Sequence, residues 1–455
     1  MMTFATFHRW PDLKSVMIWA LWVLTCLVWT VSAAQAQVMP HQSGLKSMGT
    51  VNCASSTCHG SIDERSATPV LQNEYTTWLR QDPHTQAYAV LKNEQSRRIA
   101  KNLGLPKPAH ESKVCLDCHS HNPPAAQRGP RFDATDGVNC EACHGPAEQW
   151  IKTHVEPNAT HAKNVANGLY PTNEPYAVAK LCSSCHVGDA SRPITHRIMG
   201  AGHPRISLET DTFLALQPPH YRIDADWTQR KGAFDSAKIW AMGQLVAAQN
   251  LADLMADPKR NRQGILPELM VFDCHACHSP MSKKDWTPKL GSSPGQARIN
   301  DSSLLMLQAL LKGARPELYP TLASKVNSVH VAATSPASSM TQFETAARDL
   351  QAHLKSLQPQ LASSNFNTAQ LDNVLRELLN LAGEQRLTDF AGAEQVYMSM
   401  SAVANGLQSR GNSAVGSKVN QRLPALLAFV RNDESYDRTA FQQELVKLKA
   451  SVGGQ

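Results

Sequence analysis

Ten of the eleven cysteines occur in five pairs, and a histidine directly follows the second cysteine of each pair. Four pairs have the spacing Cys-x-x-Cys-His, whereas the first pair has four residues between its cysteines. In chain order, motifs 1 to 5 are Cys53/Cys58/His59, Cys115/Cys118/His119, Cys140/Cys143/His144, Cys182/Cys185/His186 and Cys274/Cys277/His278. Two thiols one short loop apart can bond to both vinyl groups of one haem, and the adjacent histidine then ligates its iron. The pattern predicts five covalently attached haems c.

Paired cysteines also form zinc sites and disulfides. Neither alternative needs a histidine after every second cysteine, and only 18 of the 455 residues are histidine. For motif 1, with its longer loop, a Cys53–Cys58 disulfide stays the alternative, because such pairs form in an oxidising compartment. The eleventh cysteine, Cys26, lies in an N-terminal segment that we expect to be removed.

The sixth coordination position of each iron decides the function. A second histidine there gives a low-spin iron that is closed to substrates and suited to electron transfer, whereas an open position admits small ligands. Twelve histidines remain after residue 36 besides the motif histidines, which is more than five haems need. We expect distal ligands at five of them: His84, His154, His196, His203 and His220.

Local sequence favours these five histidines. Residues 82–84, Asp-Pro-His, are typical of the N-cap and first turn of a helix. Trp150 precedes His154 by one helical turn. Two glycines within 196–203 allow the backbone to approach a porphyrin, and the two prolines in 217–221 make that segment stiff. For each histidine, the alternative is a hydrogen-bonded surface or cap residue.

Residues 1–36 have the features of a secretory signal peptide. Arg9 and Lys14 precede an apolar run at 16–31, and an Ala-x-Ala cleavage site ends at Ala36. The alternative is an uncleaved membrane anchor, although a spanning helix needs about 20 apolar residues. Covalent haem attachment of this type takes place outside the cytoplasm, so the sequence predicts a periplasmic protein.

The formal net charge of +6 is not a sign of an acidic partner. Five haems would add roughly ten propionate groups, which makes the loaded protein mildly acidic or near neutral. The chain has no basic tract of the kind that binds nucleic acid. We therefore expect neither DNA nor any other nucleic acid as a partner.

The fold class that we expect is mostly α, with two domains after the signal peptide. All haem motifs lie in residues 37–295, where frequent Gly and Pro predict short helices and loops wrapped on haems, a multihaem cytochrome c fold. Residues 279–300, rich in Pro, Gly, Ser and Lys, are expected to be a linker. Residues 296–455 contain no Cys and no Trp and are expected to form a C-terminal α-helical bundle.

Apolar residues at helical spacing predict individual helices. One long helix is expected within 234–256, and another begins near Asn367 or Thr368 and ends at Gly383. Similar patterns recur at 304–311, 343–357, 419–430 and 441–448. The C-terminal domain is therefore expected to be a bundle of five or six helices.

Three segments carry a family resemblance: VLQNEYTTWLRQDPHTQAY, GVNCEACHGPAEQWIKTH and LCSSCHVGDASRPITHRIMGAGHPRISLETDTF. They resemble multihaem cytochromes of the cytochrome c-554 type, a group related in haem packing to hydroxylamine oxidoreductase and pentahaem nitrite reductase. The resemblance covers residues 50–280. It implies a mostly helical, haem-wrapping fold with haems in stacked and perpendicular pairs and mainly bis-His iron. It points to four distal ligands: His84, His154, His196 and His203. The c-554 proteins carry four haems, whereas this chain has five motifs.

Two functions follow from this pattern. The first is a periplasmic electron carrier that passes single electrons through five haems to periplasmic or membrane-bound redox proteins, met in brief, small contacts. The alternative is an oxidoreductase of nitrite, hydroxylamine, nitric oxide or a small sulfur compound at one open haem. Every motif ends in His, and none has the form Cys-x-x-Cys-Lys that resembles the catalytic haem site of nitrite reductase, which argues against the enzyme. The resemblance to the c-554 type implies one five-coordinate haem, which argues for it.

Overall fold

The computed structural model describes residues 38–264, 266–278, 298–335, 337–383, 387, 389–411 and 413–453. The expected signal peptide and the domain boundary at 295/296 lie outside the described residues, as does nearly all of the linker. Residues Pro40–Gln455 form one compact unit.

The fold is mostly α-helical, as predicted. In the described part of the chain, paired strands are limited to β1 (Arg262–Gln263) and β2 (Leu266–Pro267), which are antiparallel with Arg262 opposite Pro267.

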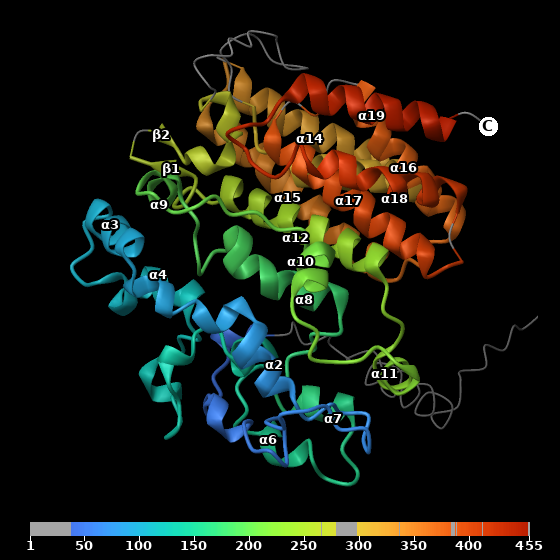
Figure 1. Cartoon of the computed structure of the whole chain (residues 1–455). Coiled ribbons are helices and arrows are strands. Elements are labelled where there is room, and N and C mark those ends of the chain that lie inside the picture. The colour runs from blue at the N-terminus through green and yellow to red at the C-terminus, as the bar shows by residue number, and fades with distance from the viewer. Residues whose placement is uncertain are drawn as a thin grey trace, which may run out of the picture. The chain divides into compact units, whose positions relative to one another are not determined.

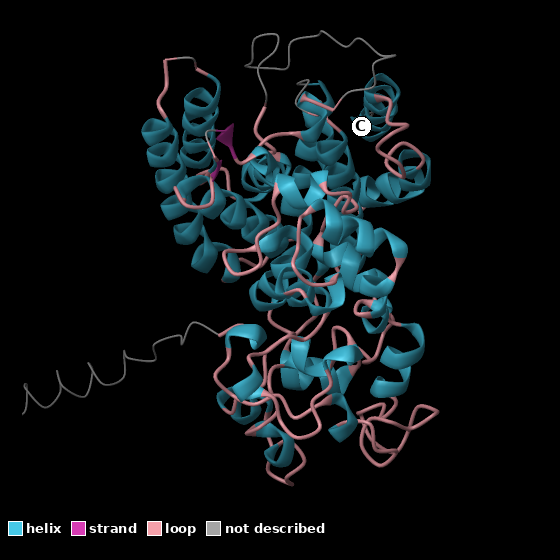
Figure 2. Cartoon of the chain, turned by 90° about the vertical axis from the view of Figure 1, so that its left-hand side faces the viewer, coloured by secondary structure: helices cyan, strands magenta, loops and turns pink. Residues whose placement is uncertain are grey.

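The chain before residue 236 forms short helices joined by long loops (Figures 1 and 2). Its α-helices are α2 (Glu74–Gln81), α3 (Glu94–Asn102), α4 (Lys113–His119), α5 (Cys140–His144), α6 (Trp150–Thr153), α7 (His161–Ala166), α8 (Pro175–Ser183), α9 (His196–Gly200), α10 (Thr210–Leu216) and α11 (Ala225–Lys231). Its 3₁₀ turns are η1 (Pro40–Gln42), η2 (Thr50–Asn52), η3 (Pro83–Gln86), η4 (Ala89–Lys92), η5 (Ala109–Glu111), η6 (Ala125–Gln127) and η7 (Ala134–Asp136), and η8 (Ser184–Gly188) is a π-helical turn. Two of its apolar clusters contain only three buried residues each.

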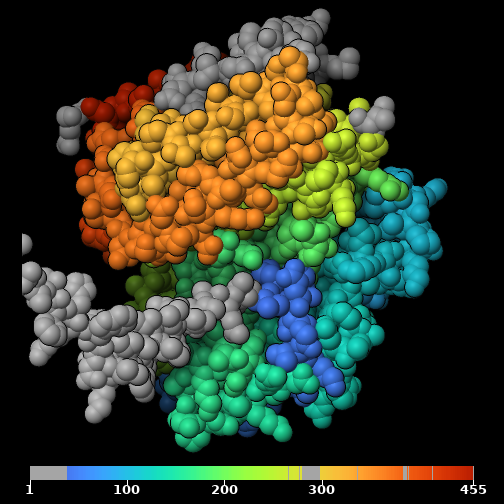
Figure 3. Space-filling view, turned by 180° about the vertical axis from the view of Figure 1, so that it is seen from behind, coloured from blue at the N-terminus to red at the C-terminus, as the bar shows by residue number. Residues whose placement is uncertain are grey.

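Glu141, which is buried inside motif 3, connects the first described residues to the rest of this region. Its carboxylate accepts hydrogen bonds from the backbone N–H groups of Met48, Gly49 and Ala147 at 2.7, 2.7 and 2.8 Å. Figure 3 shows these first residues, in blue, lying between residues coloured teal and green. The segment around residues 48 and 49 is thus held in place by motif 3.

The chain from residue 236 onward forms longer helices. They are α12 (Ser236–Ala256), α13 (Ser302–Ala314), α14 (Tyr319–Thr334), α15 (Met340–Ala362), α16 (Thr368–Gly383), α17 (Phe390–Gln408), α18 (Ala414–Leu427) and α19 (Arg438–Gly453), with the 3₁₀ turns η9 (Leu269–Val271) and η10 (Cys274–Ala276) after α12. Helix α12 packs against α8, α13, α15 and α17, and α16 packs against α13, α17 and α19. One hydrophobic core runs through all of these contacts.

The helices predicted from apolar spacing are all present, and α12 and α16 match their expected bounds closely. The structure adds α14 and α17, so the described bundle has seven helices after α12 instead of five or six. Helix α14 buries Leu322, Val326 and Val329, a sparse i, i+4, i+7 pattern. Helix α17 is rich in small residues buried around its circumference, which removes the amphipathic signal.

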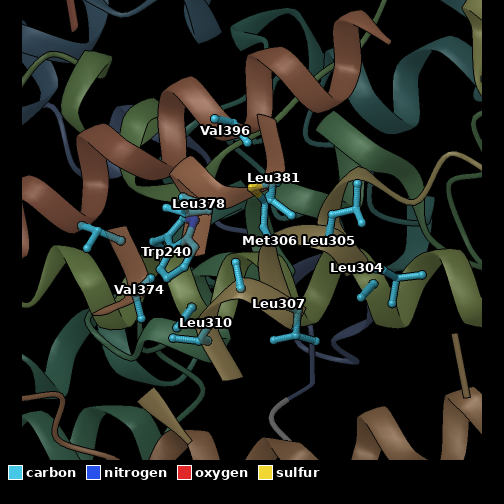
Figure 4. Close-up of a cluster of buried hydrophobic side chains, with 14 of the residues drawn as sticks. Trp240, Leu304, Leu305, Met306, Leu307, Leu310, Val374, Leu378, Leu381 and Val396 are labelled. Carbon is cyan, nitrogen blue, oxygen red and sulfur yellow. The ribbon is translucent and has the colours of Figure 1, made fainter. Parts of the chain in front are cut away.

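Trp240 lies at the centre of the core and is fully buried (Figure 4). Its indole Nε1 donates a hydrogen bond of 2.8 Å to Ser399 Oγ on α17. One turn later, Gln244 Nε2 donates to Gln395 Oε1 at 2.9 Å. Helix α12, which lies between motifs 4 and 5 in the sequence, is therefore joined to the C-terminal helices by apolar packing and by buried polar bonds.

Candidate metal centres

Each motif histidine faces one of the five histidines predicted as distal ligands. The rings pair as His59 with His154, His119 with His203, His144 with His220, His186 with His84, and His278 with His196. Ring centroids lie 6.3 Å apart in pairs 1, 3 and 5 and 6.2 Å apart in pairs 2 and 4, numbered by motif. The near-identical spacing of five independent pairs indicates a common purpose.

This spacing fits a metal ion between two imidazoles. A metal–imidazole bond is about 2 Å long, so two such bonds on opposite sides of one ion, with the ring radii added, place the centroids about 6.3 Å apart. Directly hydrogen-bonded or stacked rings have no reason to keep this distance in five different backbone settings. With two axial histidines and two nearby thiols at each position, the residues fit a covalently attached haem, whose porphyrin supplies the other four ligands.

The five pairs differ in the angle between their ring planes. The planes are 13° apart in pair 1 and 31° apart in pair 5, close to parallel. They are 71°, 86° and 89° apart in pairs 2, 3 and 4, close to perpendicular. The elements that carry the histidines therefore impose two classes of ligand geometry.

All ten motif cysteines are free thiols in the structure. The disulfide alternative for Cys53 and Cys58 is not supported. In two places, thiols of different motifs are neighbours: Cys53 lies beside Cys140, and Cys118 lies beside Cys185. The motifs are thus close together in space although they are far apart in sequence.

Motif 3 shows how local sequence places a ligand. Asn139 caps α5 by accepting hydrogen bonds from the N–H groups of Glu141 and Ala142. Helix α5 contains the whole Cys-x-x-Cys-His motif and ends at Gly145, whose φ of 81° suits glycine. A Cβ at Gly145 would lie 2.6 Å from the carbonyl oxygen of Gly168. The chain therefore turns sharply right after His144.

Backbone carbonyls orient three further imidazoles. His119 Nδ1 donates to Ala87 O at 2.9 Å, His154 Nδ1 to Trp150 O at 3.1 Å, and His203 Nδ1 to Pro204 O at 2.8 Å. The Trp150 ring also packs edge-on against His154, with centroids 5.4 Å apart, from one turn earlier as predicted. A bond at Nδ1 leaves Nε2 to face the partner ring.

Carboxylates orient two more. His59 Nδ1 donates to Glu74 Oε2 and His84 Nδ1 donates to Asp82 Oδ1, each at 2.9 Å. The sequence identified Asp82 only as a helix cap, which it is, since it also accepts from the His84 backbone N–H. Glu74 was missed, because nothing in the sequence relates it to a histidine 15 positions earlier.

The pKa values of these groups reflect the same bonds. The hydrogen bonds to Asp82 and Glu74 raise the pKa values of His84 and His59. Burial opposes ionisation of Asp82, but bonds from His84 and Gln217 hold its pKa at about 2. Burial likewise opposes ionisation of Glu74, and the bond from His59 brings its pKa below the ordinary value. Both carboxylates are therefore anionic at neutral pH.

Two other motif histidines, which are partly buried, have strongly lowered pKa values. Burial, followed by the facing His220, lowers the pKa of His144 to about 3. Burial, followed by the facing His84, lowers the pKa of His186 to about 4. These rings are neutral at pH 7, and neutral imidazole is the form that binds a metal.

Contacts between motifs define an order in space. Motif 1 adjoins motif 3 through Cys53 and Cys140. Motif 3 adjoins motif 4, because the nearby Cys182 and Cys185 contribute to raising the pKa of the Cys143 thiol, after burial. Motif 4 adjoins motif 2 through the Cys185–Cys118 bond and the packing of α4 on η8. Pairs 2 and 5 adjoin through α9, which begins at His196 and is followed by His203. The order is 1, 3, 4, 2, 5.

Six of the seven remaining histidines of the described chain have other partners. They include His41 with Ser191, His110 with Glu111, His121 with Ser47, His161 with Asn173, His275 with Phe390 and His330 with Asp301. Within the described ranges, no group of three or more His, Cys, Asp or Glu side chains is arranged to hold a metal ion unaided. Among the described helices, none is long and apolar enough to cross a bilayer.

Residues 52–145 match the family of cytochrome c554 and c-prime. The match spans motifs 1 to 3 and includes His84. Proteins of this family carry covalently bound haem c, transfer electrons and are typically periplasmic or otherwise outside the cytoplasm. Neither a curated protein nor a solved structure matches the chain.

Proposed function

We propose that this chain, whose residues 52–145 match the family of cytochrome c554 and c-prime, is a periplasmic electron-transfer protein with five haems c, each held between two histidines. The observation that carries the proposal is the uniform spacing of five histidine pairs, 6.2 to 6.3 Å between ring centroids. All five pairs include a histidine beyond the family match: His154, His203 and His220 in pairs 1 to 3, and the motif histidines of pairs 4 and 5.

A bound haem supplies an iron that takes up and releases one electron. The chain's residues supply everything else. Two thiols of each motif would hold the porphyrin, and the two facing imidazoles would bind the iron. Hydrogen bonds at Nδ1 fix the orientation of several of these rings. With both axial positions filled by protein, substrates have no place to bind on the iron, which favours electron transfer over catalysis.

The order of the motifs in space supports a path from one end of the series to the other. Motifs 1 and 5 stand at the two ends, and the exposed cysteines Cys58, Cys274 and Cys277 belong to them, whereas the other seven are only partly exposed. Electrons would enter at one end and leave at the other, through brief contacts with periplasmic or membrane-bound redox proteins.

The alternative, an oxidoreductase of a small nitrogen or sulfur compound, requires one haem with an open position. In the described structure, all five motif histidines have a facing histidine at ligand distance. The geometry therefore favours the carrier.

Mass spectrometry and low-temperature EPR of the purified, oxidised holoprotein test the proposal. We expect five haem masses per chain and only low-spin ferric iron. Nearly parallel imidazole planes give a rhombic low-spin signal and perpendicular planes a highly anisotropic one, so the angles predict two rhombic and three anisotropic signals.

Fewer than five haems would contradict the proposal. So would a high-spin signal from about one iron in five that shifts when nitrite, hydroxylamine or nitric oxide is added, because that result would favour the enzyme.

A further inference from the structure

Among the described residues, two of the ten paired histidines donate a ring hydrogen bond to a carboxylate: His59 Nδ1 in pair 1 donates to Glu74, and His84 Nδ1 in pair 4 donates to Asp82. Pairs 2 and 3 have backbone carbonyls as partners instead. In pair 2, His119 Nδ1 donates to Ala87 O and His203 Nδ1 donates to Pro204 O. In pair 3, His220 Nδ1 makes a weak bond of 3.5 Å to Pro218 O. The pairs thus differ in the charge presented to the ligand.

A carboxylate that accepts the Nδ1–H proton draws that proton toward itself and makes the imidazole a stronger electron donor through Nε2. A stronger donor stabilises ferric iron more than ferrous iron, as does a nearby negative charge in a poorly solvated site. Both effects lower the reduction potential of the haem at that position.

Resting on the proposed function, we propose that Asp82 and Glu74 are positioning residues that lower the reduction potentials of the haems at pairs 4 and 1. In the spatial order 1, 3, 4, 2, the haems at pairs with a carboxylate then alternate with haems at pairs without one. Electrons would meet lower and higher potentials in turn instead of a steady gradient.

Asp82 has the stronger effect of the two. Its side chain is 4% exposed, compared with 19% for Glu74, so solvent screens its charge less. The His84 backbone N–H and Gln217 Nε2, at 2.9 and 3.0 Å, hold the carboxylate in place. In the described structure, its contacts include no Lys or Arg that would neutralise its charge.

The variants Asp82→Asn and Glu74→Gln remove the charge and keep the shape. Asparagine is a good N-cap, so Asp82→Asn keeps η3 capped and His84 in place. Asp133→Asn is the matched control, because Asp133 also caps a short helix, η7, but bonds to Thr135 and to no histidine.

The readout is a redox titration of the holoprotein followed by EPR, in which one electron from the mediator converts one iron from ferric to ferrous. Pair 4 has perpendicular rings and pair 1 has parallel rings, so each variant affects a different class of signal. Asp82→Asn should raise the midpoint potential at which one of the highly anisotropic signals disappears. At fixed potential, its ferrous-to-ferric ratio should rise about tenfold, equivalent to about 59 mV for one electron.

Glu74→Gln should raise the midpoint potential of one rhombic signal by a smaller amount, and Asp133→Asn should leave all five midpoint potentials unchanged. Gln217→Leu tests the same idea in the opposite direction. It removes a competing donor from Asp82, leaves more negative charge for His84, and should move the pair 4 potential down.

Unchanged midpoints in Asp82→Asn and Gln217→Leu, with five low-spin haems intact, would refute the tuning role and leave the proposed function standing. High-spin iron or missing haem in the parent protein would instead refute the proposed function. A loss of low-spin signal in Asp82→Asn together with no downward shift in Gln217→Leu would show that Asp82 only holds His84 in place.

Discussion

At the scale of single residues, the candidate metal sites consist of histidines. Motif spacing and local context identify these histidines in the sequence but do not show which histidine faces which. The motif histidines follow from the Cys-x-x-Cys-His pattern, and the distal candidates from neighbours such as Trp150. That His144 faces His220, 76 positions later, depends on how the loops between them fold. No local rule connects residues so far apart.

Removing a facing histidine should open one haem. In His220→Ala, we expect one anisotropic low-spin signal to disappear and a high-spin signal of about one-fifth of the iron to appear, because His220 faces His144 at 6.3 Å. EPR of the oxidised variant checks this.

His161→Ala is the control for His220→Ala. His161 is partly buried as well, but it bonds to Asn173 at 2.8 Å and faces no motif histidine. A low-spin spectrum of His220→Ala identical to the parent's would refute the ligand assignment.

At the scale of elements, helix ends decide where ligands point. Helix α5 is predictable from its cap, since Asn139 stands one residue before motif 3. Helix α14 is not predicted because its buried apolar residues are few, and helix α17 is not predicted because residues are buried around its whole circumference. A long apolar periodicity predicts helices such as α12 and α16 well. The short helices around the motifs have too few residues for such a pattern, so the sequence does not predict their bounds.

Gly145→Ala should destabilise the protein by about 1 to 3 kcal/mol, because it forces a positive φ on a residue with a Cβ. The Cβ would also press on the Gly168 carbonyl, 2.6 Å away. Chemical denaturation measures this loss.

Gly104→Ala is the matched control for Gly145→Ala. Gly104 has a φ of 67° but open space around its Cβ position, so only the backbone term applies. Equal losses in the two variants would contradict the contact with Gly168.

Glu209, the N-cap of α10, gives a pH-dependent prediction. It is 1% exposed, and burial raises its pKa from 4.5 to about 7. The folded state therefore binds a proton that the unfolded state has released, and stability falls as pH rises from 4.5 to 7. The loss is up to about 3 kcal/mol, at about 1.4 kcal/mol per pKa unit.

Glu209→Gln should remove this pH-dependent contribution, because the amide side chain does not titrate. The two backbone N–H groups of Asp211 and Thr212 donate to different oxygens of Glu209, and the glutamine has only one oxygen, so the variant should also lose some stability at every pH. Denaturation curves of parent and variant at pH 5 and pH 8 check this. If the difference between the two proteins does not change with pH, Glu209 is ionised in the folded state.

At the scale of the whole molecule, α12 joins the part of the chain that carries the motifs to the helices that carry none. It contacts α8, which leads into motif 4, and also α15 and α17. The predicted division into domains at 295/296 rests on composition, and that boundary lies outside the described residues. Apolar periodicity located α12 but could not show which helices it contacts.

Because α12 is shared, we expect one cooperative unfolding transition of the holoprotein. The loss of helix, followed by circular dichroism, and the loss of distal ligation, followed by the haem absorption band, should have the same midpoint. Two separate midpoints would show that residues 296–455 fold as an independent domain.

Helix α9 links the last two positions of the series in a different way. His196 begins the helix, His203 follows it after Gly202, and α3 fixes it through bonds from Arg197 to Leu103 O and from Asn102 to Ala201 O. Two of the proposed ligands, which would bind neighbouring haems, thus belong to one short covalent span. Electron tunnelling falls off exponentially with distance, so thermal breathing of the surrounding loops would change the rate across this step least of all.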